Sequence, residues 1–199
     1  MWYFSCKKIY SRVFIGCNCM IKNFETIDYL KEGNEKQQRA YQTLVNHSVF
    51  GILHDFSPLL IGTIPLNVET EKSDLDIICC WKSKNLFIET LIESFAHLDQ
   101  FLLTEKKIGN RETILSTFQL GEFEIEIFGQ NRPTKHQEGY LHMVIEYNVL
   151  QANDDTFRQK IIALKREGLS TEEAFAKQLD LTGDPYHELL KFGERYLEI

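Results

Sequence analysis

The sequence predicts an α+β fold in which an α/β portion is followed by an all-helical portion. Three observations lead to this prediction. Apolar residues recur at helical spacing early in the chain, five β-like runs follow with one helix among them, and every periodic segment after Pro133 is helical. A chain of 199 residues can support such a core, because folding at this size buries about 70% of the extended surface.

The first portion begins with a helix and two strands. Its opening segment carries an apolar stripe at helical spacing, which is typical of an amphipathic helix. Pro58 and Gly62 enclose a short apolar burst that indicates a buried strand. In order, we expect a helix over 35–54, a strand over 59–61, a polar connection over 65–73, a strand over 74–81 and a helix over 84–98.

Three more strands and four helices complete the pattern. Gly109-Asn110 and Gly121 are suitable turn residues between the β-like runs. Ser170 and Glu173 form a capping-box pattern that predicts a helix start. We expect strands over 100–107, 112–120 and 122–128, and helices over 137–151, 154–167, 171–180 and 185–198.

The domain organisation is predicted from the position at which the pattern changes from mixed strands and helices to helices alone. We expect an α/β domain over 20–133 and a C-terminal helical subdomain over 134–199. Residues 1–19 carry three basic residues and no acid, and Met20 then opens a polar, helix-like stretch. The first 19 residues lack the uninterrupted apolar stretch of about 7–15 residues that a secretory signal needs. We therefore predict that they form an N-terminal extension.

Composition and charge narrow the classes of function. The net charge of −7 makes the chain a poor non-specific binder of nucleic acid, so we expect no long nucleic acid as a partner. No run of about 18 apolar residues occurs, so we expect no membrane helix. Five cysteines, an odd number without a C-x-x-C pair, indicate reduced thiols in a cytoplasmic protein.

Paired acids provide the first chemical signal. Asp74 and Asp76 share one face of the expected strand, with Cα atoms about 7 Å apart, so their carboxylates can converge on one or two hard cations. Mg²⁺ prefers such oxygen ligands, and Mn²⁺ could replace it. A third acid is expected on the strand over 122–128, where Glu124 and Glu126 alternate with apolar residues. Those two glutamates could instead form a solvated strand face.

A glycine after the first strand provides the second signal. Gly62 lets the backbone approach a phosphate closely, and the Thr63 hydroxyl can donate to phosphate oxygens. Lys72 and Ser73, directly before the paired acids, are further candidates for binding a nucleotide. Arg132 could also neutralise phosphate, although solvated basic residues are the usual case.

These two signals together carry a family resemblance. The run Ile61–Thr63 (IGT), followed after a polar gap by Asp74–Ile77 (DLDI), resembles the signature of the nucleotidyltransferase superfamily, the group with the DNA polymerase β-like fold. The stretches ETEKSDLDIICCW, FEIEIFGQ, GYLHMVIEYNVL and AFAKQLDLTGDPYHELL resemble an uncharacterised bacterial branch, known only as a domain of unknown function. The resemblance runs from about Met20 to the C-terminus and implies a nucleotidyltransferase-like mixed β-sheet flanked by helices.

The resemblance also implies roles for the acids. Asp74 and Asp76 would bind metal and act in catalysis, together with a carboxylate on a later strand. Glu126 is the expected third acid, and Glu124 is the alternative.

The expected function is a Mg²⁺-dependent transfer of a nucleoside monophosphate from a triphosphate such as ATP to an acceptor hydroxyl, with release of pyrophosphate. The acceptor would be a small molecule or a protein. One alternative is a catalytically inactive nucleotide-binding or interaction module of the same fold. Another is a glycosyltransferase that uses a nucleotide-sugar, which is disfavoured because the mostly helical segment before the first strand leaves no room for an upstream nucleotide-binding sheet.

Two further residues are candidates for the cleft. His142 and Glu146 lie four positions apart on the expected helix over 137–151. They either face the cleft and contact the acceptor or the base, or form an ordinary surface pair.

Overall fold

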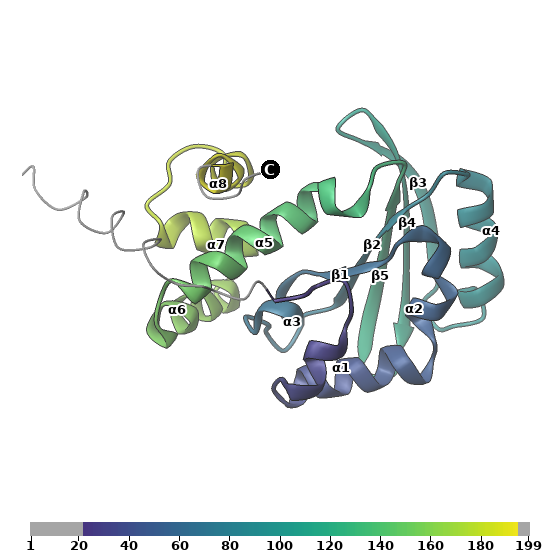
Figure 1. Cartoon of the computed structure of the whole chain (residues 1–199), viewed down its shortest axis with the longest axis horizontal. Helices are drawn as coiled ribbons and strands as arrows, with labels where there is room; N and C mark the ends of the chain where they lie inside the picture. The colour runs from purple at the N-terminus through teal and green to yellow at the C-terminus, as the bar shows by residue number, and fades with distance from the viewer. Residues whose placement is uncertain (1–21, 195–199) are drawn as a thin grey trace, which may run out of the picture.

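A computed structural model describes residues 22–194 and has the expected α+β class. Within these residues a five-stranded mixed sheet has the order β1-β2-β5-β4-β3 and is flanked by helices (Figure 1). The strands β2 and β5 are parallel, and the other neighbouring pairs are antiparallel. The strands are β1 (Leu59–Ile61), β2 (Leu75–Cys80), β3 (Leu102–Ile108), β4 (Arg111–Leu120) and β5 (Phe123–Gln130).

The helices fall into two groups. In Figure 1, α1, α2 and α4 lie on one side of the sheet, and α5 to α8 extend from the other side. The first group contains α1 (Glu35–Asn46), α2 (Val49–Ile52) and α4 (Lys84–Phe95), and the single turn α3 (Thr63–Leu66) follows β1 and contacts both α1 and α5. The second group contains α5 (Glu138–Gln151), α6 (Asp155–Arg166), α7 (Thr171–Gln178) and α8 (Pro185–Glu194). Short 3₁₀ turns occur at η1 (Asp28–Glu32), η2 (His54–Phe56) and η3 (Thr134–His136).

Two local features differ from the expected elements. The helix expected over 35–54 is interrupted, because Ser48 adopts a left-handed conformation with φ 52° between α1 and α2. The connection after β1 contains the single helical turn α3, whose Ile64, Pro65 and Leu66 are buried. An apolar pattern does not report the backbone conformation of Ser48, and the start of the polar connection expected over 65–73 is wrong because Pro65 and Leu66 are buried.

The expected turns and caps are present. Gly109, Asn110 and Gly121 all have positive φ values in the hairpins that join β3, β4 and β5. Ser170 and Glu173 form the reciprocal hydrogen bonds of a capping box at the start of α7. Local chemistry therefore determines where these elements begin and end.

The buried apolar residues form two clusters. One lies between the sheet and the first group of helices, and the other lies among α5 to α8. The division into 20–133 and 134–199 stays a prediction, because Phe24, Leu66 and Val68 of the first part join the core of the second. The extension predicted over 1–19 lies outside the described residues.

The start of α5 is fixed against the sheet. Gln137, the residue before α5, is buried and donates from Nε2 to the carbonyl of Cys79 at 2.9 Å. Two residues later, a Cβ added to Gly139 would lie 2.6 Å from Cδ1 of Ile61, so this helix packs directly on β1. This close packing brings the face of α5 over the edge of the sheet that carries the paired acids.

The described part of the chain also shows whether a helix could span a membrane and whether its cysteines are free. Among residues 22–194, no helix combines the length and the apolar content that a membrane span requires. Cys79 is buried and its neighbour Cys80 is half-buried, and both are free thiols. The cysteines at positions 6, 17 and 19 lie outside the described residues.

Candidate functional site

The three candidate acids lie on or beside β2 and β5, which run in parallel. In this register Asp76 is directly paired with Glu126, and Asp74 lies two residues before Asp76 on the approach to β2. The flanking residues Leu75 and Ile77 are fully buried, so period-2 alternation directs the acids to the opposite face. The backbone register thus gathers acids that lie about fifty positions apart in the sequence.

Repulsion and burial perturb these groups. Burial raises the pKa of Asp76 well above its ordinary value, and the nearby charges of Asp74 and Glu126 raise it further. Burial also raises the pKa of Glu126, with an added contribution from Asp74 that Lys106 partly offsets. Carboxylates gathered in this way are compensated best by a cation, and their oxygens are the donors that Mg²⁺ prefers. The residues present therefore fit a divalent ion.

Gly62 forms part of the same site. Ile61, the residue before it, pairs with Asp76 across β1 and β2. Gly62 has φ +81°, and a Cβ built on it would lie only 2.3 Å from Oδ2 of Asp76. Glycine is required here for two reasons, the positive φ and the close approach of the carboxylate to the backbone.

The loop between β1 and β2 is held by polar contacts. The hydroxyl of Thr63 donates to Oγ of Ser73 at 3.0 Å, and that oxygen also accepts from the backbone N–H of Thr70 at 2.9 Å. Lys36 donates to the carbonyls of Thr70 and Ser73 at 2.7 and 3.2 Å. Two residues predicted to bind nucleotide, Thr63 and Ser73, therefore touch each other, and both line the same cavity as the paired acids.

An open cavity of about 390 Å³ joins most of the predicted residues. One wall is the sheet edge with its adjoining loop, and the other wall is the second group of helices. The predicted residues that line this cavity are Gly62, Thr63, Lys72, Ser73, Asp74, Asp76, His142 and Glu146.

The helical wall carries charged residues that sequence reasoning missed. Lys165 of α6 and Glu172 of α7 both line the cavity and are half-buried. Burial lowers the pKa of Lys165, while Glu146, Glu172, Asp74 and Asp76 act in the opposite direction. Lysine and glutamate are common on solvated helix faces, so no local signal distinguished these two residues before the packing of α6 and α7 was known.

His142 and Glu146 are both buried on the inner face of α5, with 5% and 3% of their surface exposed. Burial lowers the pKa of His142, and the charges of Glu172, Glu138 and Asp184 oppose this. Burial raises the pKa of Glu146 well above its ordinary value. The cleft interpretation of this pair therefore agrees with its position, and the surface-pair interpretation does not.

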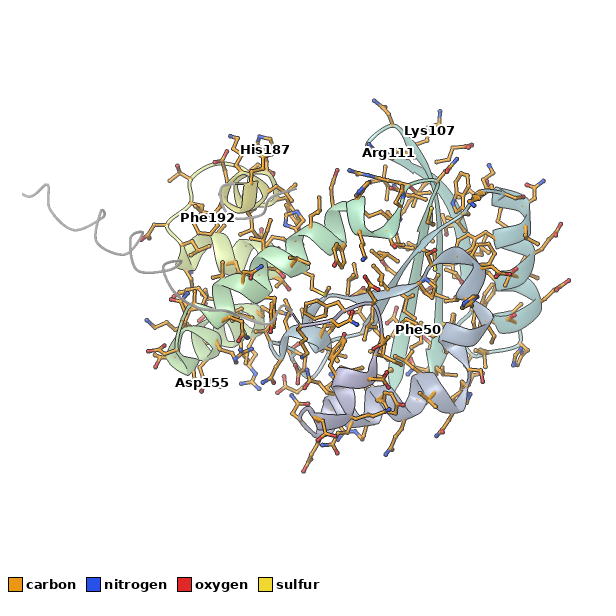
Figure 2. The ribbon with its side chains drawn as sticks, in the orientation of Figure 1. Phe50, Lys107, Arg111, Asp155, His187 and Phe192 are labelled. Atoms are coloured by element: carbon orange, nitrogen blue, oxygen red, sulfur yellow. The ribbon has the colours of Figure 1, made fainter. Side chains whose placement is uncertain are left out.

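A second, smaller cavity of about 200 Å³ adjoins the first at Asp76. Glu126 lines it, together with Arg111 of β4 and Arg132, and Arg132 lies 3.9 Å from Glu138 across an ion pair. Figure 2 shows Arg111 at the end of the β3–β4 hairpin. The lining of this smaller cavity also includes apolar residues of the sheet strands, namely Ile61, Ile77, Ile78, Ile108 and Phe128.

The position of Glu124 differs from that of Glu126. Its side chain is exposed, and it lines neither of these two cavities. Glu126 is half-buried and shares the smaller cavity with Asp76. The choice between the two stays a prediction, and the geometry favours Glu126.

Comparison with known proteins places the chain in a family. A model described as "Domain of unknown function (DUF4269)" matches residues 42–192, which include every residue of the two cavities discussed above. The chain belongs to this family, so the resemblance to a domain of unknown function is confirmed. The comparison with curated proteins finds no match.

Several solved structures are similar in outline. A mutant of the Cid1 poly(U) polymerase bound to MgATP has 14% identity and a TM-score of 0.49, with 92% of this chain and 52% of that chain covered. A Cid1 structure described as an RNA terminal uridylyl transferase has 12% identity, a TM-score of 0.48 and coverages of 70% and 45%. The GLD-2/RNP-8 complex has 8% identity, a TM-score of 0.45 and coverages of 76% and 57%. The chain thus spans about half the length of these solved chains.

Proposed function

We propose that this protein is a metal-dependent nucleotidyltransferase. The observation that carries the proposal is the parallel register of β2 and β5, which pairs Asp76 with Glu126 beside Asp74. The close approach of Gly62 to the carboxylate of Asp76 adds a backbone bend suited to a polyphosphate. The three acids and Gly62 line two cavities that adjoin each other at Asp76. A nucleotide and a metal ion could therefore occupy the site together.

The metal ligands in this proposal are the oxygens of Asp74, Asp76 and Glu126. Burial, together with repulsion from Asp74 and Glu126, raises the pKa of Asp76, and one or two Mg²⁺ ions would compensate the negative charge of these acids. When bound, the ions would neutralise phosphate charge and stabilise the attacking and leaving oxygens of an in-line displacement.

The triphosphate would lie against the loop after β1. The backbone at Gly62 and the hydroxyl of Ser73 supply donors, and the Thr63 hydroxyl orients Ser73 by donating to its Oγ. The ammonium groups of Lys72 and Lys165 supply positive charge from two sides of the cavity. Lys165 is well suited because the residue is half-buried near the acids Glu146, Glu172, Asp74 and Asp76, where a phosphate contact is less screened by water.

The reaction transfers a nucleoside monophosphate. An acceptor hydroxyl oxygen attacks the α-phosphorus, the bond from that phosphorus to the bridging oxygen breaks, and pyrophosphate leaves. The hydroxyl proton passes to a carboxylate, for which Glu126 is the candidate because it lines the smaller cavity beside Asp76.

The acceptor in this proposal is a small molecule. Its place would be the smaller cavity, which contains Glu126 and adjoins Asp76. The volume of about 200 Å³ suits a compact molecule, and Arg111 and Arg132 would favour one that carries an anionic group.

The test is a screen for pyrophosphate release. The full chain is incubated with each of the four common nucleoside triphosphates, Mg²⁺ or Mn²⁺, and pooled small-molecule acceptors, and the Asp74→Asn/Asp76→Asn variant serves as the control. We expect metal-dependent release by the parent that the double variant lacks. Equal release by both proteins would contradict the proposal, and tight nucleotide binding by the parent without release would favour an inactive nucleotide-binding module instead.

A further inference from the structure

The helical wall of the larger cavity contains a cluster that differs in kind from the acids of the sheet. His142 and Glu146 lie one helical turn apart on α5, and Glu172 approaches them from the start of α7. One donor atom from each side chain lies within 4.8 Å of the donor atoms of the other two. One imidazole and two carboxylates thus converge on a single small volume.

Two atoms in this cluster are buried without a partner. Nδ1 of His142 and Oε1 of Glu146 are shielded from solvent, and neither has a hydrogen-bond partner in the described part of the chain. Their side chains are more than nine-tenths buried. A buried polar atom without a partner costs on the order of 1–3 kcal/mol, so native proteins rarely retain two in one cluster of side chains unless something else binds there.

The surrounding groups do not satisfy these atoms. The charge of Lys165 opposes the burial that raises the pKa of Glu146. Even so, Oε1 of Glu146 has no hydrogen-bond donor in the described part of the chain. The ring of Tyr186 packs edge-on against His142, with 6.0 Å between ring centroids, and so excludes water from one side. Besides Glu172, the acids Glu138 of α5 and Asp184, just before α8, add negative potential at His142.

We propose that His142, Glu146 and Glu172 bind one divalent transition-metal ion of the Zn²⁺ class. A neutral imidazole nitrogen favours zinc and related first-row ions over Mg²⁺, and two carboxylates supply the remaining protein ligands. Three protein ligands at the wall of an open cavity leave at least one coordination position for water or a ligand, which is the arrangement of a catalytic or substrate-orienting ion. This site is separate from the all-carboxylate site on the sheet and does not depend on the proposed function.

The test measures zinc directly. Purified full-length chain is stripped with a chelator, dialysed against Zn²⁺, and its zinc content and affinity are determined by elemental analysis and by competition with a chromophoric chelator. Parent protein is compared with His142→Ala and Glu146→Gln, with His187→Ala as the matched control for an exposed histidine on α8. Asp76→Asn is included to remove an acid of the sheet site only.

We expect the parent, His187→Ala and Asp76→Asn to retain one zinc equivalent that His142→Ala and Glu146→Gln lose. The affinity should fall at least about a hundredfold, since even indirect support of a metal ligand is worth 10–100-fold. Equal zinc content in the parent and in a folded His142→Ala variant would overturn the proposal. Should these buried substitutions prevent folding, X-ray absorption of the zinc-loaded parent decides: a nitrogen and oxygen shell containing one imidazole supports the site, and a shell of sulfur or of oxygen alone overturns it.

Discussion

The two adjoining cavities contain two clusters of acidic side chains that are built in different ways. On the sheet, Asp76 and Glu126 meet because parallel strands place them in register. On the helical wall, His142 and Glu146 meet through helical spacing, and Glu172 joins them through the packing of α7. The first group consists of oxygen donors alone and the second includes a nitrogen, so the two walls suit different cations.

The largest expected effect separates the two walls by activity. Asp76→Asn should lower pyrophosphate release by about a thousandfold or more, because the metal contribution to transition-state stabilisation is several kcal/mol. Glu146→Gln, on the opposite wall, should lower it far less. Steady-state rates of the two variants in Mg²⁺ measure the difference, and a greater loss in Glu146→Gln would reverse the assignment of the two walls.

A matched pair on one strand sharpens the assignment within the sheet. Glu126→Gln should cost about a hundredfold in kcat, the scale for loss of one preorganised catalytic group, whereas Glu124→Gln should cost less than about threefold. The physical reason is that Glu126 is half-buried beside Asp76, while Glu124 is exposed and outside both cavities. Similar losses from both variants would show that the strand face acts as a whole through its charge.

Gly62 offers a test of how closely the backbone must approach the acids. Gly62→Ala should lower activity by roughly ten- to a hundredfold, because its Cβ would displace the carboxylate of Asp76. Gly121→Ala is the matched control, since Gly121 also has a positive φ of 62° but nothing within 4 Å of the added Cβ. Both variants should lose about 1 kcal/mol of stability, and only Gly62→Ala should lose activity. Equal activity in the two variants would remove Gly62 from the site.

The smallest expected effect is a pH dependence of the metal-free protein. Folding raises the pKa of Asp76, so the folded chain binds more protons than the unfolded chain between the two pKa values. The free energy of unfolding therefore falls as the pH rises through that window. With a chelator present, the free energy of unfolding of Asp76→Asn should exceed that of the parent by about 1 kcal/mol near neutral pH. This difference between the two proteins should shrink towards about pH 4. Urea unfolding at several pH values measures this, and a gain independent of pH would exclude the carboxyl as its source.

The candidate residues on the sheet side of the cavity, Gly62, Asp74 and Asp76, could be proposed from the sequence because the patterns that point to them are local. Strand alternation places Asp74 and Asp76 on one face, and a glycine directly after a strand indicates a close backbone approach. Glu126 was narrowed to one of two acids by the same alternation, and burial then distinguishes it from Glu124. The pairing of β2 with β5 was not predictable residue by residue, since register depends on the whole sheet.

The helical wall was only partly predictable. The spacing of His142 and Glu146 indicated that they share a face, but not that this face is buried against the sheet edge. Lys165 and Glu172 reach the cavity through the packing of α6 on α7, which has no signature in the sequence. The interruption at Ser48 was missed for a related reason, because a left-handed serine does not disturb the apolar pattern on either side.

The central claim is that acids from separate strands hold a metal–nucleotide complex, and calorimetric titration tests it most directly. Each of the four triphosphates is titrated into the parent and into Asp74→Asn/Asp76→Asn, with Mn²⁺ or with a chelator. The account predicts that the parent binds at least one triphosphate only when the ion is present, and that the double variant binds none under either condition. Binding of equal strength by both proteins in Mn²⁺ would contradict it.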